Sequence, residues 1–124
     1  MATVVTIELL GLENYPSVKV FVFKGQIDES NLQEASSKLD GIIADTETRY
    51  ILLNFKELEF INSKVIGYLA SVYSTASEKG KKIMIVEANE GIMDILSLVG
   101  LTTIIDHYPT LEEAIEVVKT DMEQ

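Results

Sequence analysis

Apolar and polar positions follow two different periods along the chain, and together they predict short strands that alternate with helices. Apolar and polar residues alternate over residues 3–10, which is typical of a strand with one wet face at the edge of a sheet. Residues 18–23, 50–55 and 83–86 are almost entirely apolar and predict better-buried strands. A last short strand is expected at residues 103–105.

Four segments carry apolar residues at helical spacing. Two of them follow a capping box, formed by Ser30 with Gln33 and by Thr110 with Glu113. The second helix is expected over about residues 63–79 and the third over 92–99. A glycine follows each of these two at the position where glycine ends helices.

This order, β-β-α-β-α-β-α-β-α, predicts an α/β fold. We expect a mostly parallel sheet of four to five strands with right-handed crossovers, an antiparallel N-terminal edge strand and four helices. Functional residues in such sheets lie past the carboxyl ends of the strands. We therefore expect them in the loops at 25–29, 56–62 and 87–90. With 124 residues, the chain is expected to form a single domain over residues 1–124.

The charge balance excludes several classes of partner. The chain has 10 basic and 20 acidic residues, for a formal net charge of −10. Binding to nucleic acid or to an anionic membrane surface requires clustered lysine and arginine, so neither is expected. The chain has no cysteine, which excludes disulfides and thiol nucleophiles. It has neither a signal-peptide pattern nor a run of about 18 apolar residues, so a cytoplasmic protein is expected.

Catalytic chemistry has little support in the sequence. The phosphate-binding motifs G-x-G-x-x-G and G-x-x-x-x-G-K-[ST] are both absent, and so is the G-x-S-x-G elbow. The expected loops carry six carboxylates, Asp28, Glu29, Glu57, Glu59, Glu87 and Glu90. We interpret them as a solvated acidic rim, with a magnesium site as the alternative. His107 is the single histidine, and we interpret it as an ordinary loop residue. A small hydrolase or metal enzyme that uses His107 and the rim stays as a minor hypothesis.

Ser63 is the most informative polar residue. Asn62 is a good N-cap, which places Ser63 in the first turn of the second predicted helix. The free N–H groups and the dipole at a helix N-terminus stabilise an anion. A phosphate on Ser63 would be tolerated by the fold, and its charge would repel a partner that docks on this rim.

Residues 3–119 resemble the STAS family, the domains of sulphate transporters and anti-sigma-factor antagonists. Gly25-Gln26-Ile27-Asp28 is similar to the family's Gly-x-hydrophobic-Asp segment after the second strand. The segment Phe60-Ile61-Asn62-Ser63, followed by Gly67, is similar to its phosphoacceptor segment. The family motif is commonly Asp-Ser-[Ser/Thr]-Gly, whereas this chain has Asn62-Ser63-Lys64-Val65.

The resemblance implies an anti-sigma-factor antagonist that is not an enzyme and holds no cofactor or metal. Its partner would be an anti-sigma factor that is also a serine kinase of the ATP-binding type. Phosphorylation of Ser63 would release that partner, which regulates transcription indirectly, and a serine phosphatase would restore binding. The expected binding face comprises Asp28, Glu59, Asn62, Ser63 and Lys64, with Tyr68 and Ser71, which fall off the apolar stripe of the second helix. The alternative is a STAS scaffold or small-ligand-binding module without a phosphorylation cycle.

Overall fold

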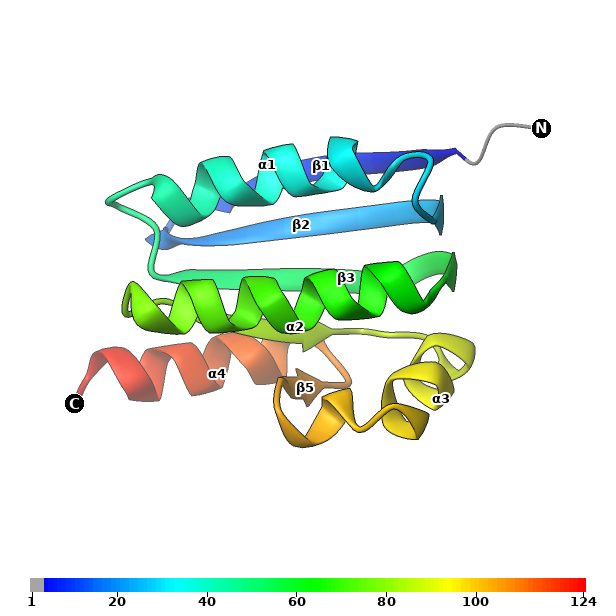
Figure 1. Cartoon of the computed structure of the whole chain (residues 1–124). Coiled ribbons are helices and arrows are strands. Elements are labelled where there is room, and N and C mark those ends of the chain that lie inside the picture. Colours follow the sequence, from blue (N-terminus) through cyan, green and yellow to red (C-terminus); the bar gives the residue numbers. More distant parts are fainter. Residues whose placement is uncertain (1–3) are drawn as a thin grey trace.

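A computed structural model describes residues 4–124 and contains one five-stranded sheet in the order β1-β2-β3-β4-β5 (Figure 1). The strands are β1 (Val5–Leu12), β2 (Tyr15–Ile27), β3 (Tyr50–Ile61), β4 (Lys82–Val86) and β5 (Asp106–Tyr108). The helices are α1 (Leu32–Ala44), α2 (Ser63–Glu78), α3 (Glu90–Leu98) and α4 (Leu111–Met122), with a short 3-10 helix, η1 (Leu101–Thr103).

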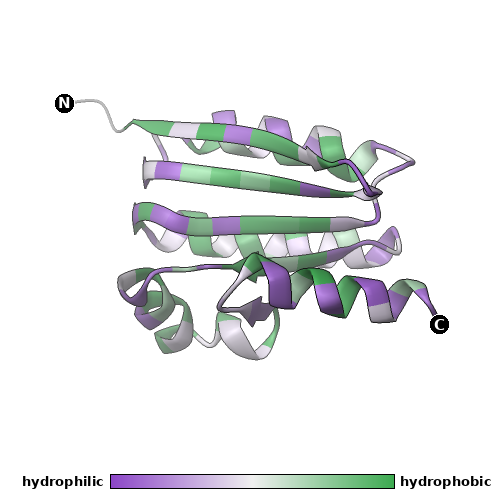
Figure 2. Ribbon diagram, turned by 180° about the vertical axis from the view of Figure 1, so that it is seen from behind, coloured by the Kyte–Doolittle hydropathy of each residue, from purple (hydrophilic) through white to green (hydrophobic). Residues whose placement is uncertain are grey.

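The predicted sheet topology is confirmed. Strand β1 pairs with β2 in the antiparallel sense, and β2, β3, β4 and β5 run parallel to one another. Helices α1 and α2 cover one face of the sheet and α4 covers part of the other, as the two opposite views show (Figures 1 and 2). Each face therefore has its own hydrophobic core, and the larger core also contains α3 residues.

The central strand β3 is buried on both faces because its first six residues are almost all apolar. Ile51, Leu53 and Phe55 belong to the core under α1 and α2, and Tyr50 and Leu52 belong to the core under α4. Successive side chains of a strand point to opposite faces, so such a run fills both cores.

The strands are longer than predicted. The strands expected at residues 3–10 and 18–23 leave residues 11–17 between them as a loop, but β1 continues to Leu12 and β2 begins at Tyr15. The loops expected at 25–29 and 56–62 are also mostly strand, since β2 extends to Ile27 and β3 to Ile61. These extensions carry many exposed polar side chains, so their sequence resembles a loop although their backbones are paired.

Three further predictions are corrected. The first helix has Asn31 as its N-cap rather than Ser30, because the Ser30 backbone N–H and hydroxyl both bond to the Asp28 carboxylate. The expected strand at 103–105 is wrong: the chain continues from Gly100 into η1, and the last strand is β5. His107 therefore lies in a strand, where it is exposed, and not in a loop.

Candidate functional site

Ser63 is the first residue of α2, as its sequence context predicts, and its side chain is exposed. The backbone of Asn62 is extended, and its side-chain Oδ1 accepts a hydrogen bond from the Val65 N–H at 3.2 Å. The Asn62 carbonyl accepts from the Ile66 N–H at 3.1 Å. Asn62 is thus an N-cap that fixes the start of the helix, with Ser63 exposed in its first turn.

The ends of β2 and β3 bring the other rim residues beside Ser63. Ile27 is paired with Ile61, so Asp28 and Asn62 each follow one member of the same pair. The Asn62 side-chain amide donates a hydrogen bond to the Glu29 carboxylate, which joins the two strand ends. Sequence reasoning placed Glu29 on the rim but missed this contact, because nothing in the local sequence links residues 33 positions apart.

Asp28 is half-buried and held in a tight turn between β2 and α1. Its carboxylate accepts from the Ser30 N–H at 2.8 Å, and its own N–H donates to the Asn31 Oδ1 at 3.0 Å. The Asn31 side-chain amide donates in turn to the Gln26 carbonyl at 2.9 Å. The turn beside Ser63 is therefore rigidly built.

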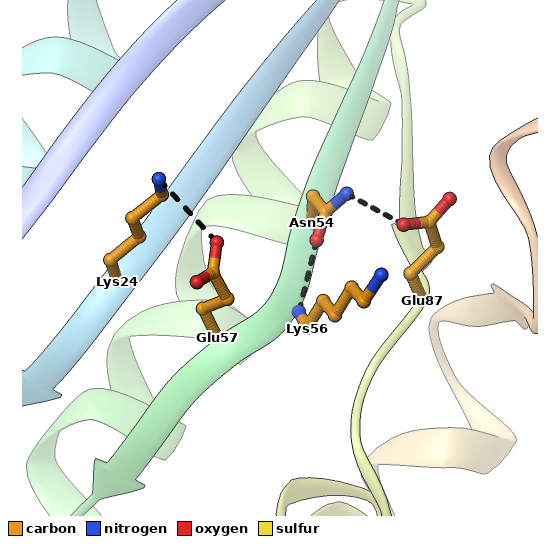
Figure 3. A network of polar contacts seen from close by, with 5 residues as sticks. All are labelled: Lys24, Asn54, Lys56, Glu57 and Glu87. Carbon is orange, nitrogen blue, oxygen red and sulfur yellow. Dashed lines mark hydrogen bonds and ion pairs between the residues drawn. The ribbon is translucent and has the colours of Figure 1, made fainter.

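Most of the rim carboxylates have protein partners, as Figure 3 shows for two of them. Glu57 forms an ion pair with Lys24 across β2 and β3 at 3.5 Å. The Glu87 carboxylate accepts from the Asn54 amide at 3.3 Å and from the Leu111 N–H, at the start of α4, at 3.1 Å. Within residues 4–124, no three acidic or histidine side chains gather closely enough to hold a metal ion. The alternative of a magnesium site on this rim has no support in the described residues.

Asn89 supports the irregular part of β3, and sequence reasoning missed it. Its side-chain amide donates to the carbonyls of Phe55, Lys56 and Leu58 at 3.1, 3.0 and 2.7 Å. Its Oδ1 caps α3 by accepting from the Ile92 N–H at 3.0 Å. One side chain thus ties the start of α3 to the segment of β3 that leads to Ser63. The only local signal was that asparagine favours helix N-caps.

The outer face of α2 differs from the prediction at one residue. The expectation that Tyr68 falls off the apolar stripe is wrong: its ring is half-buried and packs against the core under α1 and α2. Its hydroxyl lies 3.3 Å from the Asp40 carboxylate and 3.4 Å from the Ser36 carbonyl, both in α1. Burial, with Asp40 adding to it, raises the pKa of Tyr68 well above its usual range.

The remaining members of the expected face are exposed. Glu59 is exposed on β3, and Lys64 and Ser71 are exposed on α2. Phe60, next to Glu59, has an exposed fraction of 45%. The sequence analysis considered only polar residues for this face and therefore missed Phe60, whose side chain adds apolar area to an otherwise charged rim.

Comparisons with known proteins identify relatives along most of the chain. The model of the STAS domain matches residues 10–114. An anti-sigma F factor antagonist from Paenibacillus polymyxa is 23% identical over 97 residues, which cover 78% of this chain and 83% of the relative.

Two solved structures share the fold. An anti-sigma factor antagonist from Mycobacterium paratuberculosis has a TM-score of 0.78 and 21% identity, over 94% of this chain and 95% of that one. The phosphorylated form of the Bacillus cell fate determinant SpoIIAA has a TM-score of 0.69 and 18% identity, over 91% of this chain and 99% of that one. Among the residues described here, no helix is long and apolar enough to span a membrane.

Proposed function

Because this chain belongs to the STAS domain family, we propose that it is an anti-sigma-factor antagonist whose partner binding is controlled by phosphorylation of Ser63. The observation that carries the proposal is that Ser63 is exposed at the capped start of α2. Its exposure supports access by a kinase, and the segment around it is held by Asn62, Glu29 and Asn89.

The chemistry of the rim makes phosphorylation an effective switch. A phosphate would lie where the N–H groups and the dipole of α2 stabilise negative charge, so the fold would tolerate it. It would add about −1.5 to −2 charge to a surface that already carries Asp28, Glu29 and Glu59. A partner that accepts the unmodified rim would then meet strong repulsion, with no rearrangement inside the protein.

The proposed partner is an anti-sigma factor that is also an ATP-binding serine kinase, and a serine phosphatase would reverse the modification. The curated relative from Paenibacillus polymyxa is named as an anti-sigma F factor antagonist, and one structural neighbour is described in a phosphorylated form. Both descriptions favour this role over catalysis by the chain itself. We propose that the binding face comprises Asp28, Glu59, Asn62, Ser63 and Lys64, with Ser71 on α2 beside it.

Two of the departures from the common motif bear on this proposal. Asn62 replaces the usual aspartate and keeps the cap, and the nearby carboxylate is supplied by Glu29 through their hydrogen bond. Lys64 is exposed on the first turn, where its ammonium group is available to a phosphate or to the partner. Both features support Ser63 as the phosphoacceptor although the motif differs.

The test has two parts. The chain is first isolated from its own cells and its intact mass is measured, and a form heavier by one phosphoryl group should be absent from Ser63→Ala. Pull-downs from lysate then compare four baits: wild type, Ser63→Ala, Ser63→Glu and the control Ser37→Glu. Ser37 is an exposed serine on α1, so Ser37→Glu makes the same change of charge away from the rim.

We expect wild type, Ser63→Ala and Ser37→Glu to recover the same ATP-binding kinase, and Ser63→Glu to lose it. Equal recovery by all four baits, with no phosphorylated form in cells, would overturn the switch and leave the scaffold or small-ligand module as the function.

A further inference from the structure

The outer edge of the sheet is formed by β1, an eight-residue strand with exposed apolar side chains. The exposed fractions are 68% for Val4, which precedes the strand, 46% for Leu9 and 40% for Leu10. The strand carries one charge, Glu8, and neither lysine nor proline, the residues that usually protect an edge from pairing with another strand. Among residues 4–124, no other strand lies along this edge.

The direction of the backbone groups can be assigned along this strand. The Val4 carbonyl accepts a hydrogen bond from the Gln26 N–H at 2.9 Å, so the backbone polar groups of Val4 face β2. Because these groups alternate along a strand, Thr6, Glu8 and Leu10 also bond toward β2. The N–H and C=O groups of the alternate residues, Val5, Ile7 and Leu9, therefore face outward.

The polarity of the strand is palindromic about Ile7. Residues 6 and 8 are polar, residues 5 and 9 are apolar, and residues 4 and 10 are apolar. In an antiparallel pair of two identical strands with a two-fold axis at Ile7, residue i faces residue 14 − i of the other copy. Polar side chains then face polar ones, and apolar side chains face apolar ones, on both faces of the sheet.

The neighbouring registers lack this complementarity. With the axis at Glu8, two carboxylates lie directly opposite each other, which is destabilising. With the axis at Thr6, Val4 faces Glu8 of the other copy. If one strand shifts by a single residue along the other, residues whose backbone groups face outward in one copy lie opposite residues of the other copy whose backbone groups already bond to β2. The register with the axis at Ile7 is therefore favoured over its neighbours. This register is two-fold symmetric, so the strand that fits it is β1 of a second copy of the chain.

We propose that two copies of this protein associate through antiparallel pairing of their β1 strands, with the two-fold axis at Ile7. The pairing joins the two sheets into one and bonds the outward backbone groups of Val5, Ile7 and Leu9. It also covers Val4, Leu9 and Leu10, and the contact is isologous, as two-fold symmetry requires. The proposal does not depend on the function of Ser63.

The first test is the mass of the full chain by sedimentation equilibrium across a range of concentrations. We expect a dimer for wild type and for Leu98→Lys, and at least a roughly tenfold higher dissociation constant for Leu9→Lys. Leu98 has an exposed fraction of 86% and lies on α3, so Leu98→Lys is a matched control for the same change away from the edge. A monomeric wild type, or an equal effect of the two variants, would overturn the proposal.

The second test establishes the register and uses the absence of cysteine from the chain. In the proposed register, Thr6 faces Glu8 of the second copy at a Cα separation of about 4.5 Å, which a disulfide spans. Mixed Thr6→Cys and Glu8→Cys proteins should therefore cross-link under mild oxidation. Each variant alone places its two cysteines about 8 Å apart, beyond disulfide reach, and should cross-link far less. Equal cross-linking in the mixture and in the single variants would overturn this register.

Discussion

The structure predicts that Asn89, although it is not part of the expected binding face, contributes more to stability than the cap residue Asn62. Replacement of either by alanine removes a helix N-cap, which costs about 1 kcal/mol. Asn89→Ala also removes the amide contacts to the carbonyls of Phe55, Lys56 and Leu58. An amide has two protons, so these three contacts count as two hydrogen bonds.

The magnitudes follow from the surroundings of these bonds. The Lys56 contact is exposed, so water replaces it, whereas the Phe55 and Leu58 contacts are part-buried. Two part-buried bonds add about 2 kcal/mol, so Asn89→Ala should lower the free energy of unfolding by about 3 kcal/mol. Asn62→Ala loses its cap and an exposed bond to Glu29, for a total of about 1 kcal/mol.

Urea denaturation followed by circular dichroism measures both losses, and the dependence on urea should be unchanged between variants. On heating, the expected fall in Tm is about 10 °C for Asn89→Ala and about 4 °C for Asn62→Ala. A further variant, Asn89→Ser, keeps an uncharged oxygen that can cap α3 and removes the amide donors, which separates the contribution of the β3 contacts from that of the cap. Losses for the two alanine variants that agree within about 0.5 kcal/mol would refute the reasoning.

Two other predictions concern charge. The hydrogen bond from Lys82 at 2.6 Å, with that from Tyr50, lowers the pKa of Asp121. The stability that this contact contributes is therefore fully present above the pKa that Asp121 has in the unfolded chain. It is lost as the pH falls through the lower pKa that Asp121 has in the folded protein. Between pH 5 and pH 3, Asp121→Asn should therefore lose less stability than wild type. The exposed control Glu123→Gln should behave like wild type. If the stability of Asp121→Asn falls with pH as steeply as that of wild type, this explanation is wrong. Asn62→Asp should place a carboxylate against the Glu29 carboxylate and lower the free energy of unfolding by about 0.5 kcal/mol. A double-mutant cycle measured by urea unfolding tests this, because the loss should vanish when Glu29 is also replaced by glutamine.

The sequence predicts the first half of β3 and not the second, and the reason is physical. Five of the residues 50–55 are buried and all but Asn54 are apolar, so a nearly unbroken apolar run identifies them. From Phe55 onward, the buried positions are Phe55, Leu58 and Ile61, which are three residues apart. The pairing of β2 with β3 shifts register twice in this region, so the period-2 pattern of a regular strand is lost. No pattern based on alternation identifies such a strand.

In the candidate site too, the sequence predicts the features that depend on neighbouring residues and misses those that depend on contacts between distant segments. The start of α2 at Ser63 depends on Asn62, a neighbour in sequence, and the sequence predicts it. The contact between Asn62 and Glu29 depends on the pairing of two strand ends, which no local signal records. Tyr68 was misplaced for a similar reason: its ring packs against the core under α1 and α2, and its hydroxyl contacts two residues of α1, which is distant in sequence.

The two proposals together determine how partners would be arranged. The two-fold axis at Ile7 runs perpendicular to the joined sheet, so it reverses the direction of every strand in the second copy. The carboxyl edges of the two copies, each with its own Ser63, then point in opposite directions. Ser63 follows β3, two strands inward from the β1 edge, or about 10 Å. Each dimer would therefore present two separate sites, so phosphorylation of one Ser63 would release one partner and leave the other bound.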